Sequence, residues 1–356
     1  MEIDITQETN DKTFFYFSKD YGNEEFKLIE LNKDYISDYE KGEKLYIKGT
    51  TSSKATLCSS SRSSVLQSVS TSNTVLICED NSKESSNDIV VHGKVGYQIE
   101  LVTNPMDPSA LYSSLNSYKE GNGKSIQELW YNSIYSEKEI EEFLKSSFHC
   151  VCNSNKEWYS INNNDLYQYI SIITTYILNN DLNINSFSKE TILQNIQDPY
   201  PFMIEHVLSI YTKENENGTW SFKQGLLTTE IARHIFLTEG EWIPTTEYIQ
   251  LLQAELPAEY TLDLSILSSL CILESQNGVV GYHYIDMYAL PVDPKERYKH
   301  LFSIKSEWSN EELQYFINDL EKWGYGKLHD LNIQFCREVN KKNNDGTYLK
   351  VLVLKR

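Results

Sequence analysis

Short runs in which apolar and polar residues alternate fill the first third of the chain. Between residues 94 and 101, Val95, Tyr97 and Ile99 alternate with polar or small residues, the period-two pattern of a half-buried strand. Further short apolar runs, bounded by Gly, Ser, Asn and Asp, occur at residues 26–31, 44–49, 55–58, 64–69 and 73–78. Together they predict a β-rich domain over residues 1–105, a barrel or a sandwich. If these strands do not close on themselves, they leave edges that need a partner.

The pattern changes near residue 105 to helices that lead into short hairpins. Asp107–Pro108 predicts a helix start with proline at the first position, and Ser125–Glu128 and Ser136–Glu139 match the capping box. The order of helix and then hairpin recurs at residues 136–161, 202–222 and 264–285. The last of these contains Asn277–Gly278, a strong tight-turn signal. Approximate copies of one helix–hairpin unit indicate a tandem array.

The C-terminal segment gives the clearest unit. Asp293 and Pro294 predict the capped start of a helix, and Ser309–Glu312 is a capping box that starts a second helix reaching Trp323. Residues 327–339 predict a third helix, and a basic turn then leads to a strand at residues 347–354. Three helices followed by a turn and a strand are typical of a winged-helix module, a relative of the helix-turn-helix.

The fold class predicted from these patterns is α+β. A β-rich partner-binding domain over residues 1–105 is followed by tandem winged-helix-like domains over residues 106–185, 186–288 and 289–356.

The composition narrows the class of protein. The chain has 356 residues and a formal net charge of −19, which repels phosphate at long range, so any nucleic-acid contact must be local. We expect no signal peptide, because no basic segment followed by an apolar run opens the chain. No apolar stretch approaches the roughly 18 residues needed to cross a bilayer, so we expect no membrane association. Six scattered cysteines suit a reduced, intracellular compartment.

The sequence offers no defensible catalytic set. The stretch "GNGKS" at residues 121–125 resembles the end of a phosphate-binding loop, but Tyr118 stands where the motif requires glycine. Cys150 and Cys152 form half of a metal site at most, because no second pair of ligands stands at the required spacing. We therefore predict no enzymatic activity, no metal and no cofactor.

Positive charge gathers at the C-terminus. Residues 294–356 contain 12 Lys or Arg and 9 Asp or Glu, net +3, whereas residues 1–293 contain 20 and 42, net −22. Candidate phosphate contacts are Lys295, Arg297, Lys299, Lys305, Arg337, Lys341, Lys342, Lys350, Lys355 and Arg356. The alternative is a solvated face with local pairs such as Glu296 with Lys299.

Two stretches resemble a known family. "DPKERY" at residues 293–298 is followed in order by Leu301–Phe302, Trp308 and Glu311–Glu312, and "LCS" at residues 57–59 precedes "SNTVLI" at residues 72–77. In this combination and order they resemble the Dcc (defective in sister chromatid cohesion) subunit of the alternative, chromosome transmission fidelity type, replication factor C (RFC) clamp loader.

The resemblance implies a set of partners and a place of action. Dcc-like subunits join the C-terminal segment of the large ATPase subunit and a small cohesion subunit, and their N-terminal strands complete a composite β-barrel. The RFC small subunits are indirect partners, and tandem winged-helix domains are associated with DNA and with DNA polymerase epsilon. The complex loads or unloads the sliding clamp PCNA in the nucleus. Candidate partner-binding residues in the strand region are Leu45, Ile47, Leu57, Val75 and Ile77.

The main hypothesis is therefore a non-catalytic nuclear adaptor with weak, salt-sensitive binding to single- or double-stranded DNA. The alternative is a stand-alone winged-helix transcription regulator. That alternative predicts base-specific contacts from outward-facing His329, Asn332 and Arg337 on the third helix.

Overall fold

A computed structural model describes residues 14–22, 26–49, 53–80, 88–342 and 348–355. The chain forms two compact units. The first takes in the residues up to Asn104 together with Ser133–Glu139, and the second takes in Pro105–Asn132 and Ile140–Arg356. The first is rich in strands and the second mixes helices with short hairpins, which confirms the predicted α+β class. Arg356 lies outside the described residues.

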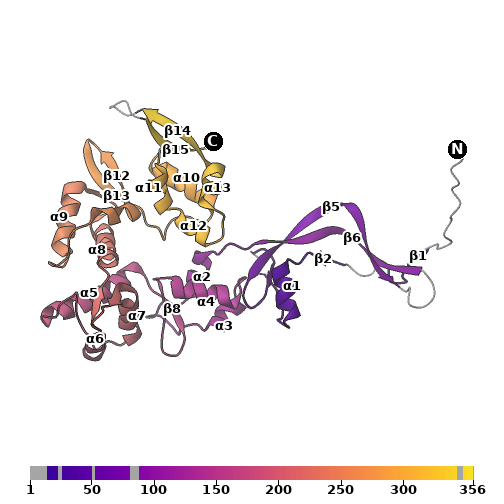
Figure 1. The fold of residues 1–356 in the computed structure, drawn as a ribbon, viewed down its shortest axis with the longest axis horizontal. Coiled ribbons are helices and arrows are strands. Elements are labelled where there is room, and N and C mark those ends of the chain that lie inside the picture. Colours follow the sequence, from indigo (N-terminus) through magenta and orange to yellow (C-terminus); the bar gives the residue numbers. More distant parts are fainter. Residues whose placement is uncertain (1–13, 23–25, 50–52, 81–87, 343–347, 356) are drawn as a thin grey trace. The chain divides into compact units, whose positions relative to one another are not determined.

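The first unit is built on one open sheet (Figure 1). Its elements are β1 (Phe14–Phe17), β2 (Leu28–Ile29), α1 (Lys33–Glu40), β3 (Tyr46–Lys48), β4 (Thr56–Cys58), β5 (Ser63–Asp80) and β6 (Asp88–Thr103). The strand order is β1-β6-β5-β4-β3, and β2 also pairs with β6. No described strand joins β3 to β1, so the described residues form neither a closed barrel nor a sandwich.

The long antiparallel pair of β5 and β6 dominates this sheet (Figure 1). Residues 64–69 and 73–78 were expected to be two strands, but they form the single strand β5. The intervening Ser, Thr and Asn residues, which resemble a turn, are absorbed by a shift of register between Ser70 and Val75. Strand β5 reaches Asp80 and β6 starts at Asp88, and residues 81–87 lie outside the described residues.

A segment from further along the chain completes the first unit. The carbonyl oxygen of Ile134 accepts hydrogen bonds from Thr56 Oγ1 (3.1 Å) and Asn104 Nδ2 (3.2 Å). The carboxylate of Glu139 accepts from the backbone N–H of Ser63 (3.1 Å) and also closes the capping box with Ser136. The sequence pattern had placed this segment in the domain starting at residue 106.

The second unit repeats one order of elements four times within the described residues: a helix, a second and third helical segment, and a hairpin. The first module (108–160) has α2 (Pro108–Ser114), α3 (Ile126–Tyr131), α4 (Glu137–Ser146), β7 (Cys150–Cys152) and β8 (Trp158–Ser160). The second (163–222) has α5 (Asn163–Asn179), α6 (Lys189–Asn195), α7 (Pro201–Tyr211), β9 (Thr212–Glu214) and β10 (Trp220–Phe222).

The other two modules follow the same order. The third (224–284) has α8 (Gln224–Glu239), β11 (Trp242–Pro244), α9 (Thr245–Glu255), the 3₁₀ helix η2 (Leu264–Ser269), β12 (Cys271–Gln276) and β13 (Val279–Tyr284). The fourth (294–354) has α10 (Pro294–Ile304), α11 (Asn310–Tyr315), α12 (Asn318–Lys322), α13 (Leu328–Phe335), β14 (Cys336–Lys342) and β15 (Tyr348–Leu354). The sequence pattern had shown only three copies, and residue 185, a predicted boundary, lies inside the second module.

One pairing closes every module. In each module, the residue two positions before the second helix pairs with a residue of the last strand of the hairpin. In the third module this residue belongs to the short strand β11. The pairs are Lys124 with Trp158, Phe187 with Trp220, Ile243 with Tyr282, and Trp308 with Leu352. In three modules the next residue is a serine whose hydroxyl oxygen caps the second helix: Ser125, Ser188 and Ser309. In these three modules a capped helix start therefore lies directly beside the segment that pairs with the hairpin.

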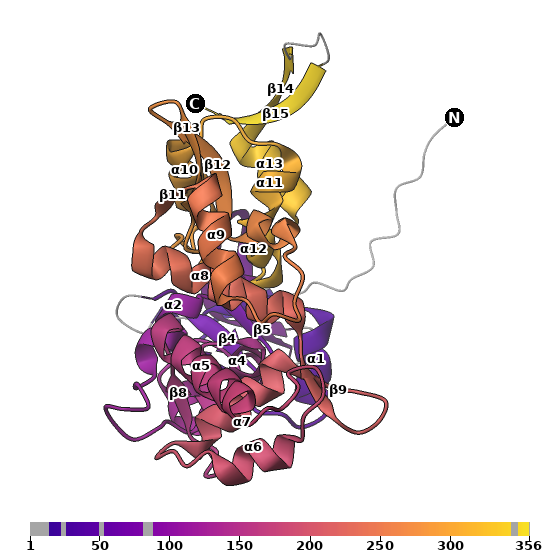
Figure 2. The same ribbon diagram turned by 90° about the vertical axis from the view of Figure 1, so that its left-hand side faces the viewer.

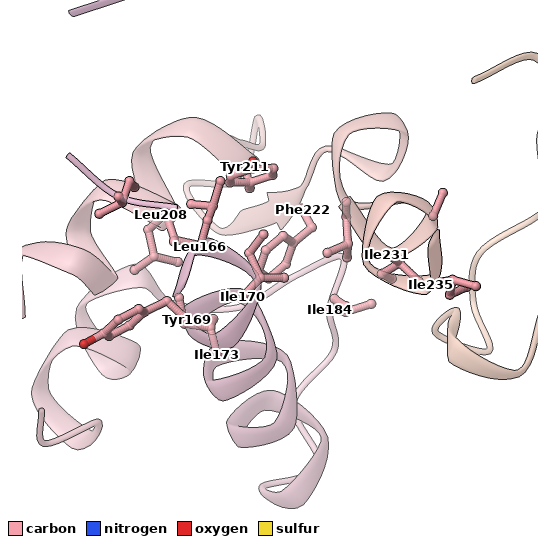
Figure 3. Packing of buried hydrophobic residues seen from close by; sticks show 14 of the residues in the cluster. Leu166, Tyr169, Ile170, Ile173, Ile184, Leu208, Tyr211, Phe222, Ile231 and Ile235 are labelled. Carbon is pink, nitrogen blue, oxygen red and sulfur yellow. The ribbon is translucent and has the colours of Figure 1, made fainter. Parts of the chain in front are cut away.

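The buried apolar side chains form two cores. One runs through the first three modules, and in Figure 3 Leu166 and Ile170 of α5 converge with Tyr211 of α7 and Phe222 of β10. The other belongs mainly to the fourth module and is centred on fully buried Trp308. Figure 2 shows the β14–β15 hairpin extending from α13 at the end of this module.

Two helix predictions in the fourth module were wrong. The helix expected to run from Ser309 to Trp323 is split into α11 and α12, because the Phe316 carbonyl accepts from the side chain of Arg297 while the Leu320 N–H bonds to Ile317. The helix expected over residues 327–339 ends at Phe335, where pairing with β15 begins. Within the described ranges, no helix is long and apolar enough to cross a membrane.

Candidate partner-binding and nucleic-acid surfaces

The residues predicted to contact partners lie on three neighbouring segments of the first sheet. Leu45 precedes β3 and is half-buried, and Ile47 of the edge strand β3 is 65% exposed. Leu57 of β4, directly opposite Ile47, is 4% exposed and belongs to the interior. Val75 and Ile77 of β5 are half-buried. The structure therefore separates an interior residue from an exposed edge, a distinction that the sequence pattern could not make.

The far part of β5 carries no core of its own. None of the side chains described between Gln67 and Glu79 is buried, and Leu76 is 40% exposed. On β6, Val91 and Val95 are buried, and Phe26 lies so close to Gly93 that a Cβ there would clash with its ring. Neither hydrophobic cluster of the chain includes a residue of this sheet. Such uncovered apolar strands are typical of a surface that another chain covers.

Strand β1 extends this apolar surface, and the sequence pattern missed it. It pairs in parallel with the start of β6, and Phe15, Tyr16 and Phe17 are all more than half exposed. The signal was present as a run of four aromatic residues, Phe14–Phe17, in a segment otherwise polar. Both edges of the sheet thus carry exposed apolar side chains, Ile47 on one and these aromatic residues on the other.

The candidate phosphate contacts fall into two groups in the fourth module. Lys295 and Lys299 are exposed on α10, where Lys299 Nζ lies 2.7 Å from Glu296 Oε1. Lys305 ends that helix and donates to both carboxylate oxygens of Glu312 (2.8 Å each). Although burial opposes it, these bonds and those from Ser309 lower the pKa of Glu312. Lys305 therefore braces α10 against α11, and Lys295 and Lys299 are the exposed cations of this helix.

Arg297 is not available for phosphate contact. Its side chain is 0% exposed and forms an ion pair with Asp319 (Nη1 to Oδ1, 2.5 Å). Its Nε donates to the carbonyl oxygen of Pro291 (2.6 Å), and its guanidinium lies over the ring of Trp323. The assignment of Arg297 as a DNA contact is therefore wrong: the residue is a structural centre of the fourth module.

The second group lies on and after the β14–β15 hairpin. Arg337, Lys341 and Lys342 are exposed on β14, and Lys350 on β15. Lys341 pairs with Glu307, and Lys350 Nζ lies 2.8 Å from Glu338 Oε1. Lys355 follows β15 and donates to the carbonyl of Ile333. Among the described residues, Arg337 and Lys342 have no carboxylate partner.

The three base-contacting residues expected of a transcription regulator do not lie together on the exposed face of one helix. Arg337 lies on β14 and not on α13, because the strand begins at Cys336. Asn332 is turned into the module, where its Oδ1 accepts from the hydroxyl of Tyr298 (2.6 Å) and its amide donates to Asn310. Of the three residues, His329 alone is exposed on α13.

The neighbouring residues His149 and Cys150 are both buried. In the described ranges, no group of three or more His, Cys, Asp or Glu side chains could hold a metal ion. Cys150 is buried, and burial raises the pKa of its thiol to about 12, so the thiolate is not formed near neutral pH. Burial also lowers the pKa of His149, whose Nε2 lies 2.6 Å from Asn163 Oδ1. Both residues are parts of the core.

Comparison with known proteins decides the family. Residues 26–317 match the family described as "Sister chromatid cohesion protein Dcc1". The chain belongs to the Dcc1 family. It is 22% identical over 354 residues to the sister chromatid cohesion protein DCC1 of Xenopus tropicalis, covering 92% of this chain and 90% of the relative. The chain is also 22% identical to the human protein over 335 residues, which cover 85% of this chain and 84% of the relative. It is 22% identical to the Saccharomyces cerevisiae protein over 364 residues, which cover 88% of this chain and 93% of the relative.

The family match covers parts of both units. The matched range begins at residue 26 and reaches α11 in the fourth module, so it includes the strands β2 to β6 of the open sheet, but not β1, and the first three modules. Dcc1 is a cohesion factor, and no catalytic family is indicated. The β14–β15 hairpin lies beyond the matched range, so its chemistry has to be derived from this chain alone.

Proposed function

We propose that this Dcc1-family chain is a non-catalytic adaptor subunit of the alternative RFC clamp loader in the nucleus. In this proposal its first unit binds the C-terminal segment of the large ATPase subunit and the small cohesion subunit. Its modules link the loader to DNA polymerase epsilon and to DNA, so that PCNA is loaded or unloaded during replication and cohesion. Family membership and the uncovered first sheet both support this assignment.

The observation that carries the proposal is the unfinished sheet. Its long strand β5 has no buried side chain among those described between Gln67 and Glu79, both edges carry exposed apolar residues, and no described residue of the sheet belongs to either core cluster. Apolar surface of this extent is stabilised when it is removed from water, by about 25 cal/mol per Å² buried. Strand addition from partner chains would supply both the backbone hydrogen bonds and the missing apolar layer, giving a composite barrel.

The modules of the second unit fit a winged-helix role. Each has three helical segments, of which the second is split into α11 and α12 in the fourth module, and a hairpin to which a third short segment pairs; this is the element order of winged-helix proteins. The fourth is favoured for DNA, because Lys295, Lys299 and the hairpin lysines are exposed there while the chain as a whole is acidic. Contacts to phosphates by exposed lysines are sequence-independent and weaken with salt.

Substitution of the edge strand tests the proposed assembly. Ile47→Asp places a charge on a 65%-exposed side chain of β3, so the fold of this chain should tolerate it while the partner interface should not. We expect the unsubstituted full chain to co-purify with the large subunit's C-terminal segment and the small cohesion subunit, and the variant to lose them. Tyr131→Asp, at a 78%-exposed site in the second unit, is the matched control and should retain them. Equal recovery with both variants would exclude β3 from the interface.

A further inference from the structure

Tyr348 is a large aromatic side chain held in the open at the start of β15. It is 68% exposed, in a module whose other large apolar side chains mostly build the second core. The pairing register sets it directly opposite Lys342 of β14, and in an antiparallel ladder such opposite residues lie on one face. The hairpin thus presents an aromatic ring and a lysine side by side.

A second lysine lies on the same face. Residues two apart along a strand share a face, so Lys350 follows Tyr348, and Asn340 stands opposite Lys350. The ion pair between Lys350 and Glu338 confirms the shared face, since the two residues sit diagonally across the ladder. That pair is exposed, with 72% and 52% of the two side chains accessible, and exposed ion pairs contribute little to stability. A phosphate can therefore replace Glu338 at little cost.

An exposed ring between cations matches the chemistry of single-stranded nucleic acid. Unpaired bases expose their faces to an aromatic side chain, whereas in a duplex these faces are covered by neighbouring base pairs. We infer that the β14–β15 hairpin is a stacking platform for single-stranded DNA. Tyr348 stacks on an unpaired base, and Lys342 and Lys350 contact the flanking phosphates. The inference rests on the proposed DNA contact of the fourth module and adds to it a strand preference and the residue that sets it.

The opposite face of the hairpin has a different character. Val339 and Leu349 are exposed there, and Lys341 is engaged with Glu307. The described residues of that face include no aromatic ring, its lysine is already paired, and its other cation, Arg337, stands at the far end of the ladder opposite Val353. The face with Tyr348, in contrast, joins a ring to Lys342, which has no carboxylate partner among the described residues. Single-stranded DNA is therefore favoured over a protein partner for the face with Tyr348.

The test compares single- and double-stranded DNA with the full chain. Fluorescence anisotropy of a labelled oligothymidylate and of a duplex of the same length measures both affinities at one fixed low salt concentration. Tyr348→Ala should weaken single-strand binding by roughly 5- to 150-fold, the value of one stacked base, and change duplex binding little. Tyr348→Phe keeps the ring and should restore most of the affinity. Tyr131→Ala removes an equally exposed tyrosine far along the chain and should have no effect.

The possible results distinguish failure of the stacking platform from failure of the proposed DNA contact. Loss of single-strand affinity in Tyr348→Ala, with rescue by Tyr348→Phe, supports the platform. If the unsubstituted chain binds both forms and Tyr348→Ala binds the single strand equally well, the platform is excluded while the DNA contact stands. If the unsubstituted chain binds neither form, the proposed DNA contact fails and the platform fails with it.

Discussion

Arg297 holds three segments of the fourth module together through one guanidinium group. It bonds Pro291 before α10, the Phe316 carbonyl at the break between α11 and α12, and Asp319 in α12. In the sequence it stands among Lys295, Glu296 and Lys299 and resembles a surface charge. The contrary signal was its spacing of four residues before Leu301, which places both on the buried face of α10. Composition alone could not reveal this, because burial of a charge depends on a partner distant in sequence.

Replacing Arg297 should therefore destabilise the fourth module. Arg297→Ala leaves the Asp319 carboxylate and the Phe316 carbonyl without their partner in a largely dry site, and breaking a buried pair in this way costs about 3–5 kcal/mol. Lys295→Ala, on the exposed face of the same helix, should change stability by less than about 0.5 kcal/mol. Urea unfolding followed by tryptophan fluorescence measures both. Equal stability of the two variants would contradict the structural role.

The burial of Arg297 also determines which variants of α10 can be used to test DNA contacts. A variant that reverses the charge of Lys295, Arg297 and Lys299 together would combine unfolding with the loss of phosphate contacts. Substitutions at Lys295 and Lys299 alone leave the buried pair intact.

At the scale of elements, a serine caps the second helix next to the residue that pairs with the hairpin in three of the four modules. Ser309 caps α11 through the N–H of Glu312, and the preceding Trp308 pairs with Leu352 of β15. Helix start and strand pairing are thus two consequences of one short stretch of chain. The same arrangement recurs at Ser125 and Ser188.

Removal of this cap should loosen the fourth module. Ser309→Ala deprives the first turn of α11 of its acceptor, and such caps are worth about 1 kcal/mol. Ser303→Ala is the matched control, because the Ser303 hydroxyl only bonds back to His300 within an exposed turn of α10. The change in urea midpoint measures both. A loss no larger for Ser309→Ala than for Ser303→Ala would mean that the cap does not fix this end of α11.

The capping signals are the part of the fold that local sequence predicted best. Asp107, Ser125, Ser136, Asp293 and Ser309 all cap as expected, since a cap depends on a few consecutive residues. Helix ends that depend on pairing with a strand distant in sequence were not predicted. Residues 336–339 left the predicted helix because β15 competes for their backbone hydrogen bonds. The sequence was divided into three winged-helix-like domains where the structure has four modules, because α2 and η2 are short, with 7 and 6 residues.

At the scale of the whole chain, the two units differ in how they are stabilised. The second unit contains both core clusters, whereas the first has few buried side chains on a sheet with two free edges. Apart from β1, which was missed, and β5, which was expected as two strands, the strands of the first unit could be predicted from their short apolar runs. The incompleteness of its core could not, because a period-two pattern is the same whether a strand is covered by its own chain or by another. Which residues lie on an exposed edge of the sheet became visible only with the strand order.

Co-expression of the first unit with its proposed partners tests the central claim most directly. The fragment should comprise residues 1–146, because Ser133–Glu139 contributes hydrogen bonds to β4 and β5. Expressed alone, it should be insoluble or unfolded. Co-expressed with the large subunit's C-terminal segment and the small cohesion subunit, it should elute from size-exclusion chromatography as one stoichiometric complex. A folded, monomeric fragment that ignores both partners would contradict the account.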